Sequence, residues 1–248
     1  MGIEIATAAG ADKANQEVVS ATLQELASAD KDIVVVTSDS RGSGKLVPFG
    51  QKFPGQMVEI GIAEQNLVGV AAGLASAGKK VFAVSPACFL SARALEQIKN
   101  DVAYSDNPVK LIGISAGVSY GALGTTHHSL HDYAALRAIN NLIVVAPADN
   151  FETEQAIRKA VEINRPIYLR FGKKTMPLLK ESAPGDFEFG KGRIIQEGQD
   201  IIFVACGETV FPSLEAAKKL EAEHGIGAGV ISMHTIKPLD HDLLSSIA

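Results

Sequence analysis

The chain has 248 residues, of which 46% are hydrophobic and 21% are charged, and its formal net charge is −5. These values describe an ordinary globular protein with room for one large domain or two small ones. Dispersed Lys and Arg residues argue against nucleic-acid binding, two cysteines are too few for a disulfide framework, and no apolar run is long enough for a membrane span. With no signal peptide or myristoylation pattern, we expect a cytoplasmic protein.

Helical and strand-like segments alternate through the first 170 residues. In chain order, the pattern predicts a helix at 13–28, a strand at 32–37, a polar loop at 38–56, a Gly/Ala-rich helix at 63–78, a strand at 80–85, a helix at 86–104, a strand at 109–115, a loop to 131, a strand at 142–145, a helix at 151–164 and a strand at 167–170. The strands are continuous apolar runs, which is typical of strands buried on both faces. We therefore predict an α/β fold with a parallel sheet covered by helices on both faces.

The alternation lapses between residues 173 and 190, where two prolines, glycines and mixed charges indicate an interdomain linker. A first domain would then cover residues 1–172 and a second would cover 191–248. The second domain is expected to contain strands at 191–196, 200–206 and 227–233, a helix at 209–224 and a helix beginning near 240. Because few strands follow the linker, we expect this second α/β domain to be incomplete.

Glu64 is the only formally charged residue between positions 63 and 78, and it stands at the start of an apolar helix rich in Gly and Ala. Such a helix is buried on most sides. A buried carboxylate needs a dedicated partner or stays protonated. The ordinary alternative is a Glu that is favoured at a helix start by the helix dipole.

Two glycine-rich motifs suggest chemistry but are incomplete. R-G-S-G-K at 41–45 resembles the end of a phosphate-binding loop, yet the Walker pattern fails twice, and a solvated loop is the more ordinary interpretation. G-V-S-Y-G at 117–121 matches the nucleophile elbow of serine hydrolases, with Ser119 as nucleophile. No helix follows it at once and no His-Gly-Gly oxyanion loop precedes it, so a serine hydrolase is a minor alternative.

His127, His128 and His131 gather at the end of the glycine-rich loop that follows the strand at 109–115. Without a further Cys or acidic cluster we predict no metal site, and we favour proton and hydroxyl handling in a cleft over a purely structural role. Phe89, early in the helix after a strand, is either a core residue or a stacking face for a ring. Arg170 ends the strand I-Y-L-R, where a guanidinium would suit an anion.

Taken together, these motifs resemble a known family. G-I-A-E-Q, A-A-G-L-A, C-F-L-S-A-R-A-L-E-Q-I-K-N-D, G-T-T-H-H, A-P-A-D-N and Y-L-R follow in the order of the pyrimidine-binding domain of transketolase-type thiamine diphosphate enzymes, through about residue 176. Residues 190–248, with V-A-C-G-E-T and I-K-P-L-D, resemble the start of that family's C-terminal domain. Deoxyxylulose-phosphate synthases and the β subunits of 2-oxo-acid dehydrogenases share much of this pattern.

The resemblance implies a role for each matching residue. Glu64 would hydrogen-bond N1′ of the cofactor's aminopyrimidine and promote its imino tautomer, which then serves as the base at the thiazolium C2. Phe89 would stack on the pyrimidine, and Ile62 would belong to the apolar wall beside it. His127 would handle substrate hydroxyls and protons, and Arg170 would bind the phosphate of a sugar phosphate.

Three departures from the family pattern bear on function. Leu123 stands where larger transketolases carry an Asp that contacts a donor hydroxyl, and Ser115 falls where some place another substrate His. We count Ser115 and the adjacent His128 among the substrate-binding residues. The G-D-G motif that binds magnesium and diphosphate is missing, so the resemblance implies that another polypeptide supplies that half of the site.

We therefore expect the β-type subunit of a split transketolase that transfers a two-carbon ketol unit between sugar phosphates. It would use thiamine diphosphate and Mg²⁺, the ion being held mainly by a diphosphate-binding partner subunit, in a heterotetramer. A 2-oxo-acid dehydrogenase β subunit or a deoxyxylulose-phosphate synthase-like enzyme is the alternative within the superfamily. A non-catalytic scaffold subunit is the alternative from another class, although Glu64, Phe89 and His127 together argue against it. No nucleic-acid or membrane partner is expected.

Overall fold

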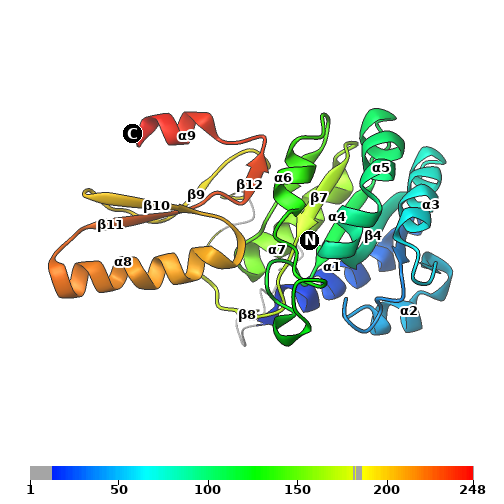
Figure 1. Ribbon diagram of the computed structural model, residues 1–248, viewed down its shortest axis with the longest axis horizontal. Helices are drawn as coiled ribbons and strands as arrows, with labels where there is room; N and C mark the ends of the chain where they lie inside the picture. The colour runs from blue at the N-terminus through cyan, green and yellow to red at the C-terminus, as the bar shows by residue number, and fades with distance from the viewer. Residues whose placement is uncertain (1–12, 181, 183–185, 248) are drawn as a thin grey trace, which may run out of the picture.

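A seven-stranded sheet forms the centre of the computed structural model, which describes residues 13–180, 182 and 186–247 (Figure 1). Its strand order is β12-β6-β7-β5-β4-β2-β3. The strands are β2 (Ile33–Thr37), β3 (Met57–Glu59), β4 (Lys80–Pro86), β5 (Lys110–Ile114), β6 (Ile143–Val145), β7 (Ile167–Arg170) and β12 (Thr235–Lys237). Neighbours from β6 to β3 pair in parallel, whereas β12 is antiparallel to β6.

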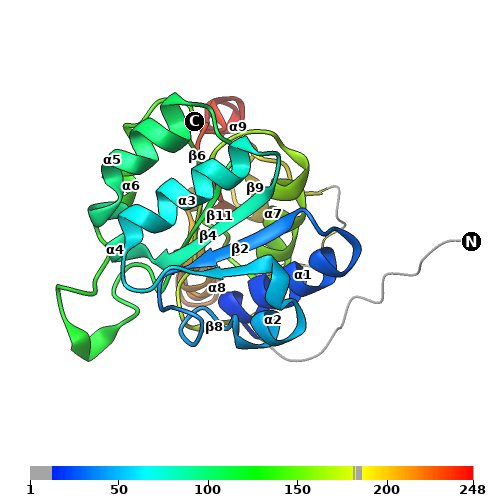
Figure 2. The same cartoon turned by 90° about the vertical axis from the view of Figure 1, so that its right-hand side faces the viewer.

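Helices cover both faces of this sheet (Figure 2). One face carries α1 (Asn15–Ala29), α2 (Val47–Lys52) and α7 (Asn150–Glu162), and the other carries α3 (Glu64–Ser76), α4 (Ala87–Arg93), α5 (Leu95–Gln97) and α6 (Asp132–Arg137). Side chains alternate between the two cores along each strand: Val35 packs on the first side, and Val34 and Val36 on the second. This arrangement confirms the predicted α/β fold and explains why the strands are apolar throughout.

Some elements differ from the predicted ones. The helix predicted at 86–104 is divided into α4, α5 and a π-helix, Ile98–Tyr104, whose wider turn accommodates an extra residue. The polar loop at 38–56 contains α2. Two-residue strands β1 (Lys13–Ala14) and β8 (Thr175–Met176) pair antiparallel, which places the first part of the expected linker against the N-terminal end of α1. Strands this short carry no periodic signal, and sequence reasoning missed them.

A smaller unit follows residue 190. Strands β9 (Arg193–Gln196), β10 (Ile201–Ala205) and β11 (Ala228–Ser232) form a sheet in the order β10-β11-β9, along which α8 (Val210–His224) lies (Figure 1). Helix α9 (His241–Ser246) comes last in the described chain. The core of this smaller unit joins Val210 and Leu214 of α8 to Val230 of β11. Within the described residues, no helix has the length and apolar character that a membrane crossing requires.

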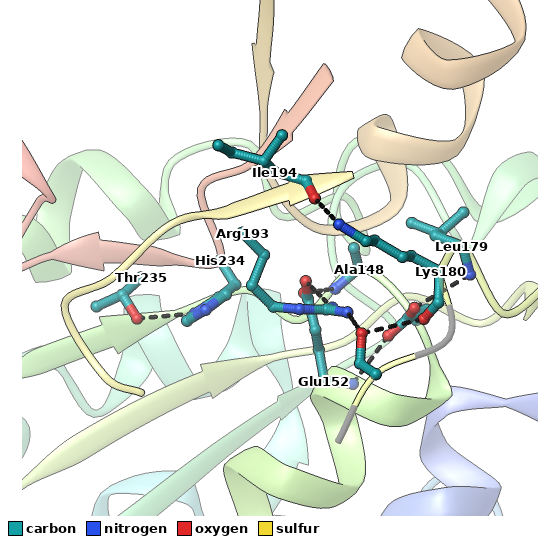
Figure 3. Close-up of polar contacts among 10 residues, drawn as sticks. Ala148, Glu152, Leu179, Lys180, Arg193, Ile194, His234 and Thr235 are labelled. Atoms are coloured by element: carbon teal, nitrogen blue, oxygen red, sulfur yellow. Dashed lines mark hydrogen bonds and ion pairs between the residues drawn. The ribbon is translucent and has the colours of Figure 1, made fainter. Parts of the chain in front are cut away.

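A buried ion pair ties this smaller unit to the main sheet (Figure 3). Arg193 of β9 lies 2.7 Å from a carboxylate oxygen of Glu152 in α7, and the two side chains are 6% and 0% exposed. The other Glu152 oxygen accepts the Ala148 backbone N–H at 2.7 Å. Burial raises the pKa of Glu152, and the Arg193 charge opposes that shift. Because neither charge reaches water, each stabilises the other, and loss of Arg193 would leave the Glu152 carboxylate buried without a counter-charge.

His234 lies beside this pair and is fully buried. Its ring stacks on Phe187 with centroids 4.3 Å apart. Figure 3 shows the polar contact of Nδ1, which lies 2.9 Å from the Thr235 hydroxyl. Nε2 has no hydrogen-bond partner among the described residues. Burial and the Arg193 charge lower the pKa of His234 to about 3, while Asp240 acts in the opposite direction. His234 is therefore a neutral ring of the core.

Neutral burial of His234 predicts acid-sensitive folding. Its pKa is about 3 in the folded chain and 6.5 when exposed, so the unfolded chain binds more protons between these values. Stability that is fully present above pH 6.5 is lost as the pH falls toward 3. We expect the unfolding free energy of the wild type to fall when the pH is lowered from 7.5 to 5.0. In His234→Phe this fall should be smaller by about 2 kcal/mol, as measured by urea titration at each pH.

The control is His224→Gln, because the His224 side chain is 60% exposed at the end of α8. It should follow the wild-type pH profile. Parallel profiles for wild type and His234→Phe would show instead that His234 protonates normally in the folded chain.

Candidate active site

The predicted site residues gather at one edge of the main sheet. Parallel pairing brings the carboxyl ends of β3, β2, β4, β5 and β7 to this edge. Glu64 begins the helix after β3, Phe89 lies in the helix after β4, His127 lies in the loop after β5, and Arg170 ends β7. Segments from distant parts of the sequence therefore meet where open α/β sheets bind ligands.

Glu64 has a dedicated partner, as its burial requires. Its side chain is 3% exposed, and Oε2 accepts a hydrogen bond of 2.9 Å from a terminal nitrogen of Arg93, the last residue of α4. The guanidinium carbon of Arg93 also lies 4.4 Å from the centroid of the Phe89 ring. Among the described residues, Oε1 of Glu64 makes no hydrogen bond. The carboxylate thus keeps one oxygen for another donor beside an aromatic face.

Aromatic contacts connect Phe89 to the histidine loop. The Phe89 and His127 rings meet edge-on with centroids 5.2 Å apart, and Tyr120 meets His127 in the same way at 5.3 Å. Nδ1 of His127 lies 2.9 Å from the Thr126 hydroxyl. Next to this row, a cavity of about 600 Å³ opens between α4 and the loop, with Arg93, Phe89 and Thr126 in its lining. Arg93 therefore links Glu64 to Phe89, and the Phe89 ring in turn contacts His127.

Arg170 is more committed to the protein than expected of a free anion clamp. Its side chain is 18% exposed, and Nε lies 2.7 Å from the fully buried carboxylate of Asp132. Its terminal nitrogens donate to the Tyr133 hydroxyl and the Ser129 carbonyl, at 3.2 and 3.1 Å. Three of its five N–H donors are used in this way, which leaves two. Asp132, which in the sequence stands with the histidines as a conceivable metal ligand, instead neutralises much of the Arg170 charge.

The other expected site residues have different surroundings. Ser115 is fully buried at the end of β5 and accepts a hydrogen bond from Gln16 at 3.2 Å. Ile62 is 74% exposed, and it does not line the cavity. His128, in the cavity lining, lies 3.1 Å from the Gly121 carbonyl through Nε2. The structure therefore brings His128 to the cavity and leaves Ile62 on the surface.

The serine-hydrolase alternative finds no geometric support among the described residues. The Ser119 hydroxyl donates to the Ala116 carbonyl at 2.6 Å rather than to a histidine, and a 3₁₀ turn, Gly121–Leu123, follows in place of a helix. In the described part of the chain, no three His, Cys, Asp or Glu side chains are grouped to hold a metal ion.

Sequence reasoning missed two residues of the site, Arg93 and Tyr120. Arg93 is the nearest cation to follow Phe89, at the i+4 position of the same helical segment. That spacing, combined with the need of Glu64 for a partner, could have identified it. Tyr120 was read only as the variable residue of a serine elbow, and no local pattern indicates that its ring reaches His127.

Two family models match the chain: the transketolase pyrimidine binding domain over residues 12–177 and the transketolase C-terminal domain over residues 190–248. A subunit of the apulose-4-phosphate transketolase of Phocaeicola vulgatus is 48% identical, over 92% of this chain and 72% of that protein. A solved structure described as "Split gene transketolase, inactive beta4 tetramer" has a TM-score of 0.85 and 39% identity, and it covers 95% of this chain and 75% of its own. The 1-deoxy-D-xylulose-5-phosphate synthase of Trichormus variabilis is 36% identical over 94% of this chain, but over only 36% of that protein.

The Arg93–Glu64 pair predicts a measurable coupling. Arg93→Met keeps the aliphatic stem but leaves a carboxylate of 3% exposure without its partner, and we expect a loss of about 1–3 kcal/mol of unfolding free energy. In a Glu64→Gln background the same change should cost much less, because no buried charge remains to be paired. Urea denaturation of the two single variants and the double variant measures this difference.

The matched control is Lys79→Met, which breaks an ion pair with Asp32 whose side chains are 40% and 59% exposed. Exposed pairs contribute about 0–1 kcal/mol. Equal losses for Arg93→Met with and without Glu64 would contradict the pairing.

Proposed function

This chain belongs to the transketolase family, and from this premise we propose that it is the β-type subunit of a split, thiamine diphosphate-dependent transketolase. It would transfer a two-carbon ketol unit between sugar phosphates when joined to a diphosphate-binding subunit. The observation that carries the proposal is the arrangement of Glu64, Phe89 and His127. Phe89 and Arg93 line the cavity, Arg93 pairs with the buried Glu64 carboxylate, and the His127 imidazole contacts the Phe89 ring.

These residues fit the pyrimidine end of the cofactor. A flat heteroaromatic ring with a nitrogen acceptor and an amino group needs an apolar face and a carboxyl partner, which Phe89 and Glu64 supply. Arg93 makes both of these contacts in this structure. Because its side chain is 49% exposed, its guanidinium can turn toward water and give up the Phe89 face.

When bound, thiamine diphosphate supplies the carbon that attacks the sugar carbonyl and stabilises the resulting negative charge. The residues of this chain would position the cofactor and the substrate and exchange protons with them. Glu64, fixed at the start of a buried helix, would share a proton with the pyrimidine nitrogen in a dry setting, where the carboxylate charge most strongly favours the protonated ring. His127 exchanges protons with substrate hydroxyls, and Thr126 orients its ring through Nδ1. Ser115, His128 and Arg170 are proposed to bind substrate.

A partner subunit is proposed to hold Mg²⁺ and the diphosphate, because the sequence has no G-D-G motif. Large apolar side chains are exposed on the two segments that carry Glu64 and His127: Ile62, Leu123 and Leu130 are 74%, 57% and 71% exposed. Exposed apolar surface next to a site is a feature of interaction surfaces. We propose that they contact this partner in a heterotetramer.

Two further assignments complete the proposal. We propose a cytoplasmic location, because Cys88 and Cys206 are both free thiols and the cytoplasm is a reducing compartment. We also propose domains at 1–172 and 191–248 joined by a linker at 173–190, with β12 of the second domain returning to the sheet of the first.

The test is to co-purify this chain with its partner and to assay ketol transfer from a ketose phosphate to an aldose phosphate with thiamine diphosphate and Mg²⁺. Glu64→Gln should lower kcat by about 100-fold or more, because a neutral amide cannot promote the needed tautomer. Glu215→Gln, on the exposed face of α8, should leave kcat unchanged.

Unchanged turnover in Glu64→Gln would refute the assignment of Glu64. Turnover by this chain without a partner would refute the split-enzyme proposal. Pyruvate in place of the ketose phosphate tests the synthase alternative, which the similarity to 1-deoxy-D-xylulose-5-phosphate synthase favours.

A further inference from the structure

Tyr120 lies where three segments of the sheet edge meet. Its ring is edge-on to His127, with centroids 5.3 Å apart and an angle of 71° between the planes. Its hydroxyl lies beside the hydroxyls of Ser115, at the end of β5, and Ser43, in the loop after β2. Burial raises the pKa of Tyr120, so the phenol is neutral near pH 7. It can therefore both donate and accept hydrogen bonds next to the imidazole assigned to proton transfer.

Lys173 covers the same ring from the segment after β7. Its ammonium lies 4.6 Å from the Tyr120 centroid. Among the described residues, no carboxylate forms an ion pair with Lys173. The neighbouring Lys174 differs, because burial raises the pKa of Glu208 while the positive charge of Lys174 counteracts that rise. Lys173 is thus an exposed cation held at the site by an aromatic face and not neutralised by an acid.

The charge of Lys173, unpaired among the described residues, matters because Arg170, the cation already proposed to bind substrate, is partly engaged by the protein. Arg170 is paired with the buried carboxylate of Asp132 and gives three of its five donors to the protein. Leu123 is 57% exposed and carries no polar group where larger transketolases have a hydroxyl-binding Asp. Arg170 keeps only two donors for a substrate, so other side chains near His127 can supply a further hydrogen bond and a charge that no carboxylate in the described part of the chain neutralises.

We propose that Tyr120 and Lys173 form a specificity-determining subsite for the substrate. The phenol binds a sugar hydroxyl beside the carbon at which His127 acts, and the ammonium binds the anionic group at the end of the sugar. The two contacts of the Tyr120 ring place the ammonium within about 10 Å of the His127 ring, a span suited to a short sugar phosphate. The inference rests on the proposed ketol transfer.

The charge contact is tested on the two-subunit enzyme with ribose 5-phosphate and ribose as acceptors. Lys173→Met should raise KM for ribose 5-phosphate about tenfold and leave KM for ribose unchanged, because only the first acceptor carries an anion. Lys174→Met is the matched control and should change neither value. Calorimetric titration of both sugars into the pair measures the same preference without turnover.

The phenol contact is tested with Tyr120→Phe, which keeps the ring contacts with His127 and Lys173. Its kcat/KM should fall about tenfold for ribose 5-phosphate and for ribose alike, because each loses the same hydrogen bond. The preference for the phosphorylated acceptor should stay at the wild-type value. Tyr120→Phe and Lys173→Met therefore have different signatures.

The outcomes separate this inference from the proposed function. If the wild-type pair catalyses ketol transfer but Lys173→Met discriminates between the acceptors as before, the subsite is refuted. If Tyr120→Phe matches the wild type with both sugars, the phenol contact is refuted. If the pair binds ribose 5-phosphate through Lys173 in calorimetry but catalyses no transfer, the proposed function fails and the anion contact stands.

Discussion

Parallel pairing of β3, β2, β4, β5 and β7 is the constraint on which the rest of the structure depends. Parallel strands need a crossover after each strand, so both faces are covered by helices and all carboxyl ends open on one edge. The two buried cores form between the helices and the sheet. The same pairing carries Glu64, Phe89, His127 and Arg170, which are more than 100 residues apart at the extremes, to a common edge.

Two buried carboxylates, each paired with an arginine, differ in how far the arginine reaches into water. Glu152 and Arg193 are 0% and 6% exposed, so neither can leave the other without a large desolvation cost. Glu64 is as well buried at 3%, but its partner Arg93 is 49% exposed. The first pair locks two units of the chain together. The second stabilises a carboxylate whose partner can move into water, which is what a ligand-binding carboxylate requires.

The sequence was informative where local patterns decide structure. Continuous apolar strands predicted the parallel sheet, and the charge of Glu64 in an apolar helix predicted a special environment. Strands β1, β3, β8 and β12 have two or three residues and form only because a partner strand is near, so no local pattern revealed them. Tyr120 and Asp132 acquire their roles through contacts with His127, Lys173 and Arg170, which depend on the assembled edge.

The loop after β5 explains how substrate preference can vary on a fixed scaffold. Glu64 and Phe89 belong to helices packed on the sheet, whereas the loop projects from the body of the molecule (Figure 2). None of the described residues 117–131 belongs to the buried apolar clusters, and Val118, Leu123 and Leu130 are 61%, 57% and 71% exposed. Because burial of apolar surface dominates stability, substitutions in this loop leave the fold largely intact. The groups proposed to hold the cofactor are therefore constrained by packing, while those proposed to meet the sugar, Tyr120 among them, are free to change with the substrate.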